Sequence, residues 1–161
     1  MQRIRVGFGI DVHRLQEGEA LRLGGVSIPF HKRLEGHSDA DVLLHAICDA
    51  LLGAASLRDI GVQFPNTSDK FKGINSLILL EKTAQLVRKK GFTIGNIDCT
   101  LVLQEPKIAP YIPQMKTAIS TILQLPTDDI SIKATTTEHL GYEGRSEGIT
   151  AYAVTLVVTE C

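Results

Sequence analysis

The chain has 161 residues, a length typical of one domain that can bury a core without disulfide or metal support. Hydrophobic residues make up 43% of it and charged residues 22%, close to the averages for soluble globular proteins. The formal net charge of −1 excludes a global positive field that would recruit nucleic acid, so any anion site must be local. No apolar run approaches the roughly 18 residues of a membrane span, so no membrane partner is expected. We therefore expect one domain over residues 1–161.

The cysteines and the N-terminus indicate a cytoplasmic protein. Cys48, Cys99 and Cys161 are an odd number without CxxC spacing. Cys48 and Cys99 lie within apolar patterns and are expected to be small buried hydrophobic residues. Residues 1–10 lack the charged-then-apolar layout of a signal peptide. A reducing compartment is the expectation.

The N-terminal part of the chain favours short strands. Residues 3–9 predict a strand that runs into a loop carrying Asp11 and His13. Residues 21–29 predict a hairpin-like pair of short strands, broken at Gly24-Gly25.

Residues 38–56 predict a long helix. Ser38 suits its N-cap, and Asp41 stands three residues later as a shortened capping-box partner. Its apolar residues recur at three- and four-residue spacings, as expected for a helix with one buried face: Val42, Leu43, Ala46, Ile47, Ala50, Leu51 and Ala54.

The remainder alternates between helices and strands, after a loop whose length is typical of functional loops. In chain order we expect a loop over 59–73, a helix over 74–90, a strand over 94–104, a helix over 110–125, a strand over 129–135, a loop over 136–147 and a strand over 149–159. The last strand is apolar or small on both faces, so another layer of structure is expected to pack against each face. The fold class is therefore α+β, a mixed sheet with helices on one face and a subunit interface on the other.

Asp11 and His13 are spaced i, i+2, which places them on the same side of an extended segment. A carboxylate and an imidazole can hold two positions of a tetrahedral zinc, and His45 is the best third ligand. Three protein ligands with an open fourth position are typical of catalytic zinc. A capped loop with a surface histidine explains Asp-x-His equally well when that pair is taken alone.

His45 lies four residues after Asp41 and four before Asp49, so all three share one helical stripe. A carboxylate beside a ligand histidine fixes its tautomer, so Asp41 or Asp49 is expected to support His45. The alternative is a core histidine satisfied by two acids.

His37 and Ser38 open the predicted helix, where unpaired N–H groups and the helix dipole favour a phosphate. The alternative is an exposed histidine beside an ordinary cap.

Two further runs follow predicted strands. Lys133-Ala-Thr-Thr-Thr-Glu138 offers hydroxyls for phosphate and a carboxylate for a magnesium-type ion, although threonine also favours strands in general. The second run, Gln104-Glu105-Pro106-Lys107-Ile108, contains a lysine that can bind a phosphate. The alternative is an ordinary loop lysine. A Walker A motif is absent from the sequence, and the residues favour phosphoryl transfer by positioning and charge neutralisation.

Together these residues resemble the 2-C-methyl-D-erythritol 2,4-cyclodiphosphate synthases of the non-mevalonate isoprenoid pathway. The resemblance covers nearly the whole chain, and its motifs are GxDxH at 9–13, GHSDADVLLHAICDALLGA at 36–54, DIGVQFPN at 59–66, PKIAPYIPQM at 106–115 and KATTTEHLGYEGRSEGI at 133–149. Asn66 stands where the family pattern leads us to expect aspartate, which puts an anionic contact there in doubt.

The resemblance implies a homotrimer in which the sheets of three subunits face the trimer core and active sites lie between neighbours. It implies a cytidine diphosphate-type substrate, 4-diphosphocytidyl-2-C-methyl-D-erythritol 2-phosphate, whose 2-phosphate attacks the β-phosphorus and releases CMP. It also implies zinc or another divalent ion at Asp11, His13 and His45, and Mg²⁺ or Mn²⁺ with the substrate diphosphate at Glu138.

The resemblance also implies residue roles. His37 and Thr136 would stabilise the transition state, and Arg145 and Glu147 would lie near a central trimer channel. The full set of substrate contacts implied is Asp11, His13, His37, Ser38, Asp59, Ile60, Gly61, Phe64, Pro65, Asn66, Thr67, Ser68, Leu103, Pro106, Lys107, Ile108, Ala109, Thr135, Thr136, Thr137, Glu138, Tyr142 and Arg145.

Two other functions fit the same residues. A metal-dependent phosphohydrolase would use the zinc to activate water. A trimeric binding module with structural zinc would need four protein ligands, whereas the sequence suggests three.

Overall fold

The computed structural model describes residues 2–65 and 67–159 of the chain. Asn66, expected to contact substrate, and Cys161 lie outside the described residues. Five strands form one mixed sheet in the order β4-β1-β7-β5-β6, in which only the β5–β6 pair is parallel. These strands are β1 (Ile4–Glu17), β4 (Lys32–Leu34), β5 (Phe92–Val102), β6 (Ile130–Thr135) and β7 (Gly148–Thr159). A separate hairpin pairs β2 (Ala20–Leu23) with β3 (Val26–Pro29).

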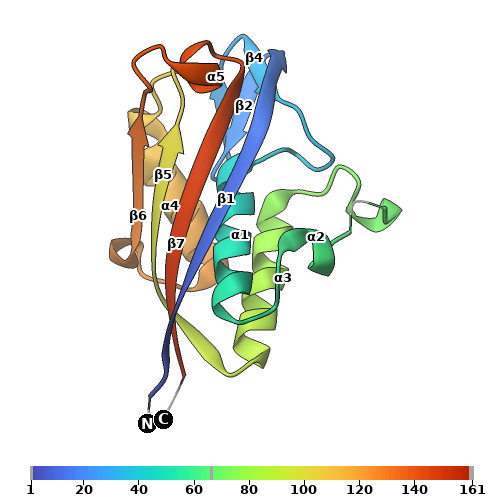
Figure 1. Ribbon diagram of the computed structural model, residues 1–161, viewed down its shortest axis with the longest axis vertical. Coiled ribbons are helices and arrows are strands. Elements are labelled where there is room, and N and C mark those ends of the chain that lie inside the picture. Colours follow the sequence, from blue (N-terminus) through green and yellow to red (C-terminus); the bar gives the residue numbers. More distant parts are fainter. Residues whose placement is uncertain (1, 66, 160–161) are drawn as a thin grey trace.

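Three long helices cover one face of the sheet, which confirms the expected α+β class (Figure 1). They are α1 (Val42–Ala54), α3 (Ser76–Lys89) and α4 (Ile112–Leu123). α1 packs on β1 and β7, α3 packs on α1, and α4 packs on α3 and β6. Short helical turns lie in the connections: α2 (Ile60–Gln63), η1 (Asp69–Phe71), η2 (Ala109–Tyr111), η3 (Thr127–Asp129) and α5 (Gly141–Gly144). Within the described residues no helix is long and apolar enough to span a bilayer.

The opposite face of the sheet is apolar and is left exposed by the described part of this chain. Alternate residues of β1 and β7 point there, because successive side chains of a strand face opposite sides. The exposed set is Ile4, Val6, Phe8, Ile10, Val12, Tyr152 and Val154. Phe8 and Tyr152 stack with ring centroids 6.2 Å apart. The expectation of a second apolar sheet face is thus confirmed.

β1 lies directly on α1 because two glycines face the helix. A Cβ on Gly7 would stand 1.8 Å from the carbonyl oxygen of Ala50, and one on Gly9 would stand 2.0 Å from that of Ala46. Only glycine fits at such a distance. Asp11 and His13 lie on the same face of β1 as the two glycines, so the close contact brings them beside His45 of the helix.

β1 is longer than predicted, and this corrects the expectation that Asp11 and His13 lie in a loop. β1 pairs with β7 from Ile4–Val158 to Arg14–Gly148, so the polar residues stay within the ladder. Continuous pairing with a long neighbouring strand outweighs the local polar sequence. β4, α2 and α5 were likewise not predicted.

The helix start also differs from the prediction. α1 begins at Val42 with Asp41 as its N-cap, so Ser38 is not the cap. The buried Asp41 carboxylate accepts hydrogen bonds from the backbone N–H groups of Leu44, Gly24 and Gly25 at 3.1, 2.9 and 2.7 Å. One side chain thus joins the helix start to the β2–β3 turn, a tertiary contact that no local pattern reveals.

Candidate metal and phosphate site

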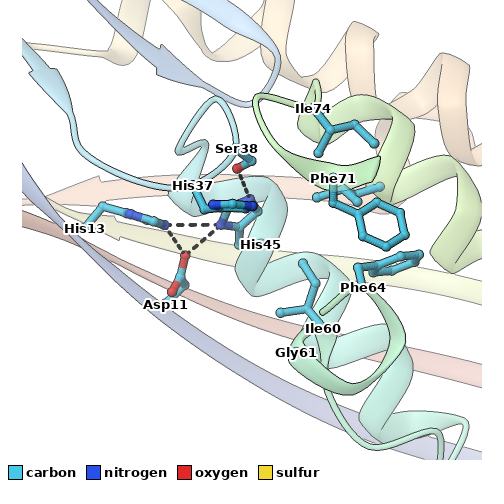
Figure 2. A pocket seen from close by; sticks show the side chains of 11 residues that line it. Asp11, His13, His37, Ser38, His45, Ile60, Gly61, Phe64, Phe71 and Ile74 are labelled. Atoms are coloured by element: carbon cyan, nitrogen blue, oxygen red, sulfur yellow. Dashed lines mark hydrogen bonds and ion pairs between the residues drawn. The ribbon is translucent and has the colours of Figure 1, made fainter. Parts of the chain in front are cut away.

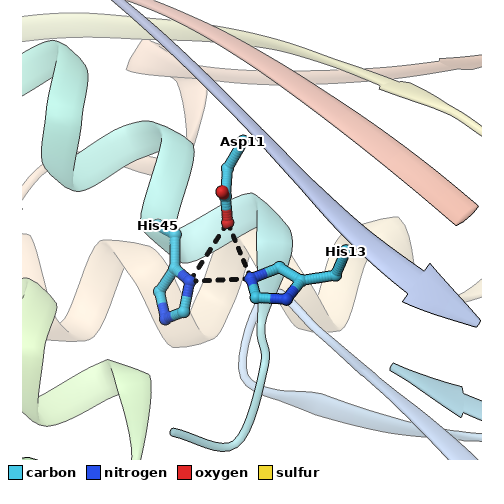
Figure 3. A group of neighbouring side chains, drawn as sticks. All are labelled: Asp11, His13 and His45. Atoms are coloured by element: carbon cyan, nitrogen blue, oxygen red, sulfur yellow. Dashed lines mark hydrogen bonds and ion pairs between the residues drawn. The ribbon is translucent and has the colours of Figure 1, made fainter. Parts of the chain in front are cut away.

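Three electron-pair donors converge where β1 meets α1. Oδ2 of Asp11 lies 2.9 Å from Nε2 of His13 and 3.1 Å from Nδ1 of His45, and the two nitrogens lie 3.2 Å apart. Figure 3 shows the three side chains directed at one another from the strand and the helix. Each is partly buried, with side-chain exposures of 29% for Asp11, 16% for His13 and 13% for His45. The expected juxtaposition of these three residues is present.

Hydrogen bonds behind the two histidines orient their rings. Nδ1 of His13 donates to the carbonyl oxygen of Glu35 at 2.7 Å. Because a neutral imidazole carries one hydrogen, Nε2 of His13 is left with a lone pair that faces the cluster. Nε2 of His45 lies 3.0 Å from Oγ of Ser38 and 2.9 Å from Oγ of Ser76.

The charges of the cluster stabilise one another. Burial raises the pKa of Asp11, but hydrogen bonds and charges from His13 and His45 outweigh it and lower the pKa to about 2. Burial disfavours the imidazolium of His13, but the hydrogen bond and charge of Asp11 outweigh it and raise its pKa. Asp11 is therefore a carboxylate at neutral pH, with positive charge favoured beside it.

These donors fit a divalent cation. Ligand atoms held about 2.0–2.1 Å from a tetrahedral zinc are about 3.3–3.4 Å apart, close to the separations of the three donors here. Among the described residues these three form the only group of histidine, cysteine and acidic side chains close enough to share an ion. Three donors leave a fourth position open, as in catalytic sites.

A cavity of about 180 Å³ opens beside the cluster. In Figure 2 its Asp11–His13–His45 end faces an apolar end formed by Phe64 and Phe71. Eight expected site residues line it: Asp11, His13, His37, Ser38, His45, Ile60, Gly61 and Phe64. Three lining residues were not predicted, namely Phe71, Ile74 and Leu79.

A second cavity of about 210 Å³ lies at the ends of β5 and β6. The predicted substrate contacts that line it are Leu103, Pro106, Lys107, Ile108, Ala109, Thr135 and Thr136. Across the sheet Asp11 is in register with Ala151, then Leu101, then Ala134. Three strand spacings, about 14 Å, therefore separate the metal cluster from the second cavity within one chain.

The other predicted residues lie around these cavities. Asp59 is the N-cap of α2 and accepts a hydrogen bond from the Val62 N–H at 3.0 Å. Tyr142 lines a third hollow together with His13. The connection between α2 and η1 contains three more of the predicted substrate contacts, Pro65, Thr67 and Ser68.

The remaining predicted site residues lie in the turns that follow β6. The Thr137 hydroxyl donates to the carbonyl oxygen of Leu140, and that of Thr136 donates to Glu138 Oε1 at 3.3 Å. Glu138 is exposed and does not belong to the metal cluster of this chain. Arg145 pairs with Glu147 at 2.8 Å.

Neither Asp41 nor Asp49, the acids expected to support His45, is hydrogen-bonded to its ring. Asp41 accepts from three backbone N–H groups, and Asp49 accepts from the Ile60 N–H at 2.8 Å. The ring is supported instead by Ser38 and Ser76. Ser76 opens α3 and is distant in sequence, so no local spacing signals its role.

A family model described as the YgbB family matches residues 4–158. Curated 2-C-methyl-D-erythritol 2,4-cyclodiphosphate synthases include one from Syntrophobacter fumaroxidans, 60% identical over 96% of this chain and 97% of its own. Another, from Cytophaga hutchinsonii, is 54% identical over 97% of this chain and 98% of its own.

Solved structures agree with these relatives. The Plasmodium falciparum IspF–CDP complex has a TM-score of 0.86 at 36% identity, covering 98% of this chain and 97% of that one. The bifunctional IspDF of Campylobacter jejuni has a TM-score of 0.95 at 41% identity, covering 99% of this chain but 43% of that longer one. The chain belongs to the YgbB family and is a member of the 2-C-methyl-D-erythritol 2,4-cyclodiphosphate synthases.

Proposed function

We propose that the chain performs this family's reaction as a metal-dependent phosphorus–oxygen lyase, with Asp11, His13 and His45 as the metal-binding half of the site. The reaction converts 4-diphosphocytidyl-2-C-methyl-D-erythritol 2-phosphate to the 2,4-cyclodiphosphate and CMP, in the non-mevalonate pathway. The single observation that supports the metal site most is the convergence of three donor atoms within 3.2 Å of one another.

The reaction is an intramolecular displacement. An oxygen of the 2-phosphate forms a bond to the β-phosphorus, and the bond from that phosphorus to the bridging oxygen breaks, so that CMP leaves with the oxygen. Because attacker and target belong to one molecule, the chain chiefly has to hold the substrate folded. The cavity beside the cluster supplies His37 and Ser38 for the phosphates and Ile60, Gly61 and Phe64 for the erythritol part.

Zinc or another divalent ion, held by Asp11, His13 and His45, would neutralise phosphate charge so that two anions can approach each other. Glu138 would bind Mg²⁺ or Mn²⁺ together with the diphosphate. His37 and Thr136 would donate hydrogen bonds to the charge that develops on the reacting phosphates.

The cavity at β5 and β6 is the proposed cytidine half of the site. Its lining combines apolar side chains with Lys107 and the hydroxyls of Thr135 and Thr136, which suits a base and its phosphates. A solved relative is named as a complex with CDP.

A homotrimer would bring the two halves together from neighbouring chains. The exposed apolar face of β1 and β7 is the proposed interface, because a surface of this character is stabilised by burial against a copy of itself. The 14 Å estimated between the halves within one chain supports a site shared by two subunits.

Product analysis tests the proposal. Wild type, His45→Ala and the control His31→Ala would be incubated with substrate and followed by ³¹P NMR, with bound zinc quantified. His31 lies outside the cavity that the cluster lines. We expect wild type and His31→Ala to form CMP and the cyclic diphosphate, and His45→Ala to lose zinc and activity together. Inorganic phosphate as the product would favour the hydrolase, and full cyclisation by zinc-free His45→Ala would refute the metal site.

A further inference from the structure

Ser76 and Asp39 form a hydrogen-bonded pair behind His45. The Ser76 backbone N–H donates to Oδ2 of Asp39 at 3.0 Å, and the Ser76 hydroxyl is hydrogen-bonded to Oδ1 of the same carboxylate. Ser76 is fully buried, and its Oγ lies 2.9 Å from Nε2 of His45. Arg22 adds a positive charge near the carboxylate, with Nε 3.9 Å from Oδ2.

The direction of each hydrogen bond follows from what a carboxylate can do. Because a carboxylate only accepts, the single hydrogen of the Ser76 hydroxyl points to Asp39. Only lone pairs of Ser76 Oγ remain toward His45, so Nε2 of His45 has to be the donor. Nδ1 then keeps its lone pair, and it faces Asp11 and His13. Ser38 Oγ, 3.0 Å from Nε2, offers a second acceptor (Figure 2).

We propose that Asp39 and Ser76 are positioning residues that fix the tautomer of His45 so that Nδ1 is presented as the metal ligand. The inference rests on the metal site proposed above. Supporting groups behind ligand histidines commonly change metal affinity by about tenfold to a hundredfold when removed. The two residues touch neither metal nor substrate and act only through the ring.

Asp39→Asn is the most informative variant, because it keeps the volume of the side chain and reverses the direction of its hydrogen bond with the Ser76 hydroxyl. Oδ2 of Asp39 accepts from the Ser76 N–H at 3.0 Å and faces the charge of Arg22, whereas Oδ1 accepts from the Asp41 N–H at the longer distance of 3.3 Å. The asparagine oxygen is therefore expected at the Oδ2 position, where the shorter bond and the positive charge favour an acceptor. The NH₂ then donates to Ser76 Oγ, whose hydrogen turns toward Nε2 of His45. That arrangement favours a hydrogen on Nδ1, where the ligand lone pair is needed.

Thr83→Val is a matched control on the same helix. Thr83 is two turns after Ser76, is also fully buried, and its hydroxyl acts on the thiol of Cys48. The substitution keeps the shape and removes one buried hydroxyl of α3. It should therefore leave zinc affinity unchanged.

The experiment measures zinc affinity by competition with a chromophoric chelator, and the absorption spectrum of each protein saturated with Co²⁺. We expect Ser76→Ala and Asp39→Asn to bind zinc about tenfold to a hundredfold more weakly than wild type. Their Co²⁺ spectra should keep the wild-type band, because all three ligands remain, whereas His45→Ala should lose it. Thr83→Val should match wild type in both measurements.

Two outcomes would overturn the inference and are distinguishable. If wild type binds zinc and both variants bind it equally well, the tautomer role is wrong while the metal site stands. If wild type itself binds no zinc, the metal site fails and the inference fails with it.

Discussion

Gly9 lies so close to Ala46 that a Cβ on the glycine would stand 2.0 Å from the alanine carbonyl oxygen. The two residues are immediate neighbours of the metal cluster, since Asp11 follows Gly9 by two positions and Ala46 follows His45. Their contact sets the distance between the strand and the helix that supply the ligands. The backbone of α1 cannot move aside without moving His45.

Gly9→Ala should therefore impair folding and metal binding together. Overpacking against backbone is expected to lower the free energy of unfolding by about 3 kcal/mol or more. Urea unfolding and zinc titration would measure both effects. Gly53→Ala is the control, because a Cβ there meets nothing within 4 Å and alanine favours a helix. Equal stability and zinc affinity in Gly9→Ala and wild type would contradict the close-packing account.

Asp41→Ala should destabilise the protein by about 2–4 kcal/mol, because three backbone N–H groups lose their buried acceptor. Asn75→Ala removes the N-cap of α3, where one backbone N–H is bonded at 2.9 Å, and should cost about 1 kcal/mol. Urea unfolding of metal-free protein would compare them. Equal losses in the two variants would show that the bonds to Gly24 and Gly25 contribute little.

The loss in Asp41→Ala should also depend on pH. Burial raises the pKa of Asp41 from 3.8 to about 6, although N–H groups of Gly25, Leu44 and Gly24 lower it. Because the folded pKa lies above the unfolded one, the contribution is complete below pH 3.8 and declines as pH rises through 6. The stability difference between wild type and Asp41→Ala should be larger at pH 5 than at pH 8. A difference that grows with pH would contradict the raised pKa.

Cys48 and Cys99 should resist alkylation in the folded protein. Burial raises the pKa of each thiol to about 12, so thiolate is scarce at pH 8 and access is blocked. Peptide mapping after iodoacetamide treatment should find both unmodified in buffer and modified in denaturant. Rapid modification of either one under native conditions would show that the core opens.

Phe8→Asp should dissociate the proposed trimer, because it places a charge at the centre of the exposed apolar face of β1 and β7. Ile78→Asp is the control, since Ile78 is exposed on α3, away from that face. Sedimentation velocity should give a trimer for wild type and the control, and a smaller species for Phe8→Asp. A trimer that survives Phe8→Asp would place the interface elsewhere.

The spacing of apolar residues was sufficient to predict much of the fold. The seven residues expected on the buried face of the first long helix are all buried in α1. The final segment, expected as a strand over 149–159 that is apolar or small on both faces, matches β7 almost to the residue. These patterns succeed because burial of apolar side chains dominates the choice of secondary structure.

Local sequence patterns failed to predict the structure where contacts between distant segments determine it. Asp11 and His13 lie in a strand because β7 pairs with them, and Asp41 replaces Ser38 as cap because its carboxylate also reaches the β2–β3 turn. The convergence of Asp11, His13 and His45, the proposed metal ligands, was predictable from residue type and spacing. Their support by Ser76 was not, because it depends on how α3 packs against α1.

In the proposed trimer one chain supplies the metal half of each site and a neighbour supplies the cytidine half. Co-expression of two differently tagged inactive variants, His45→Ala and Thr136→Ala, tests it most directly through the cyclase activity of purified mixed oligomers. In every trimer that contains both variants, one of the three shared sites combines two intact halves, so about a third of wild-type activity per site should return. Mixed oligomers with no more activity than either parent would contradict the claim.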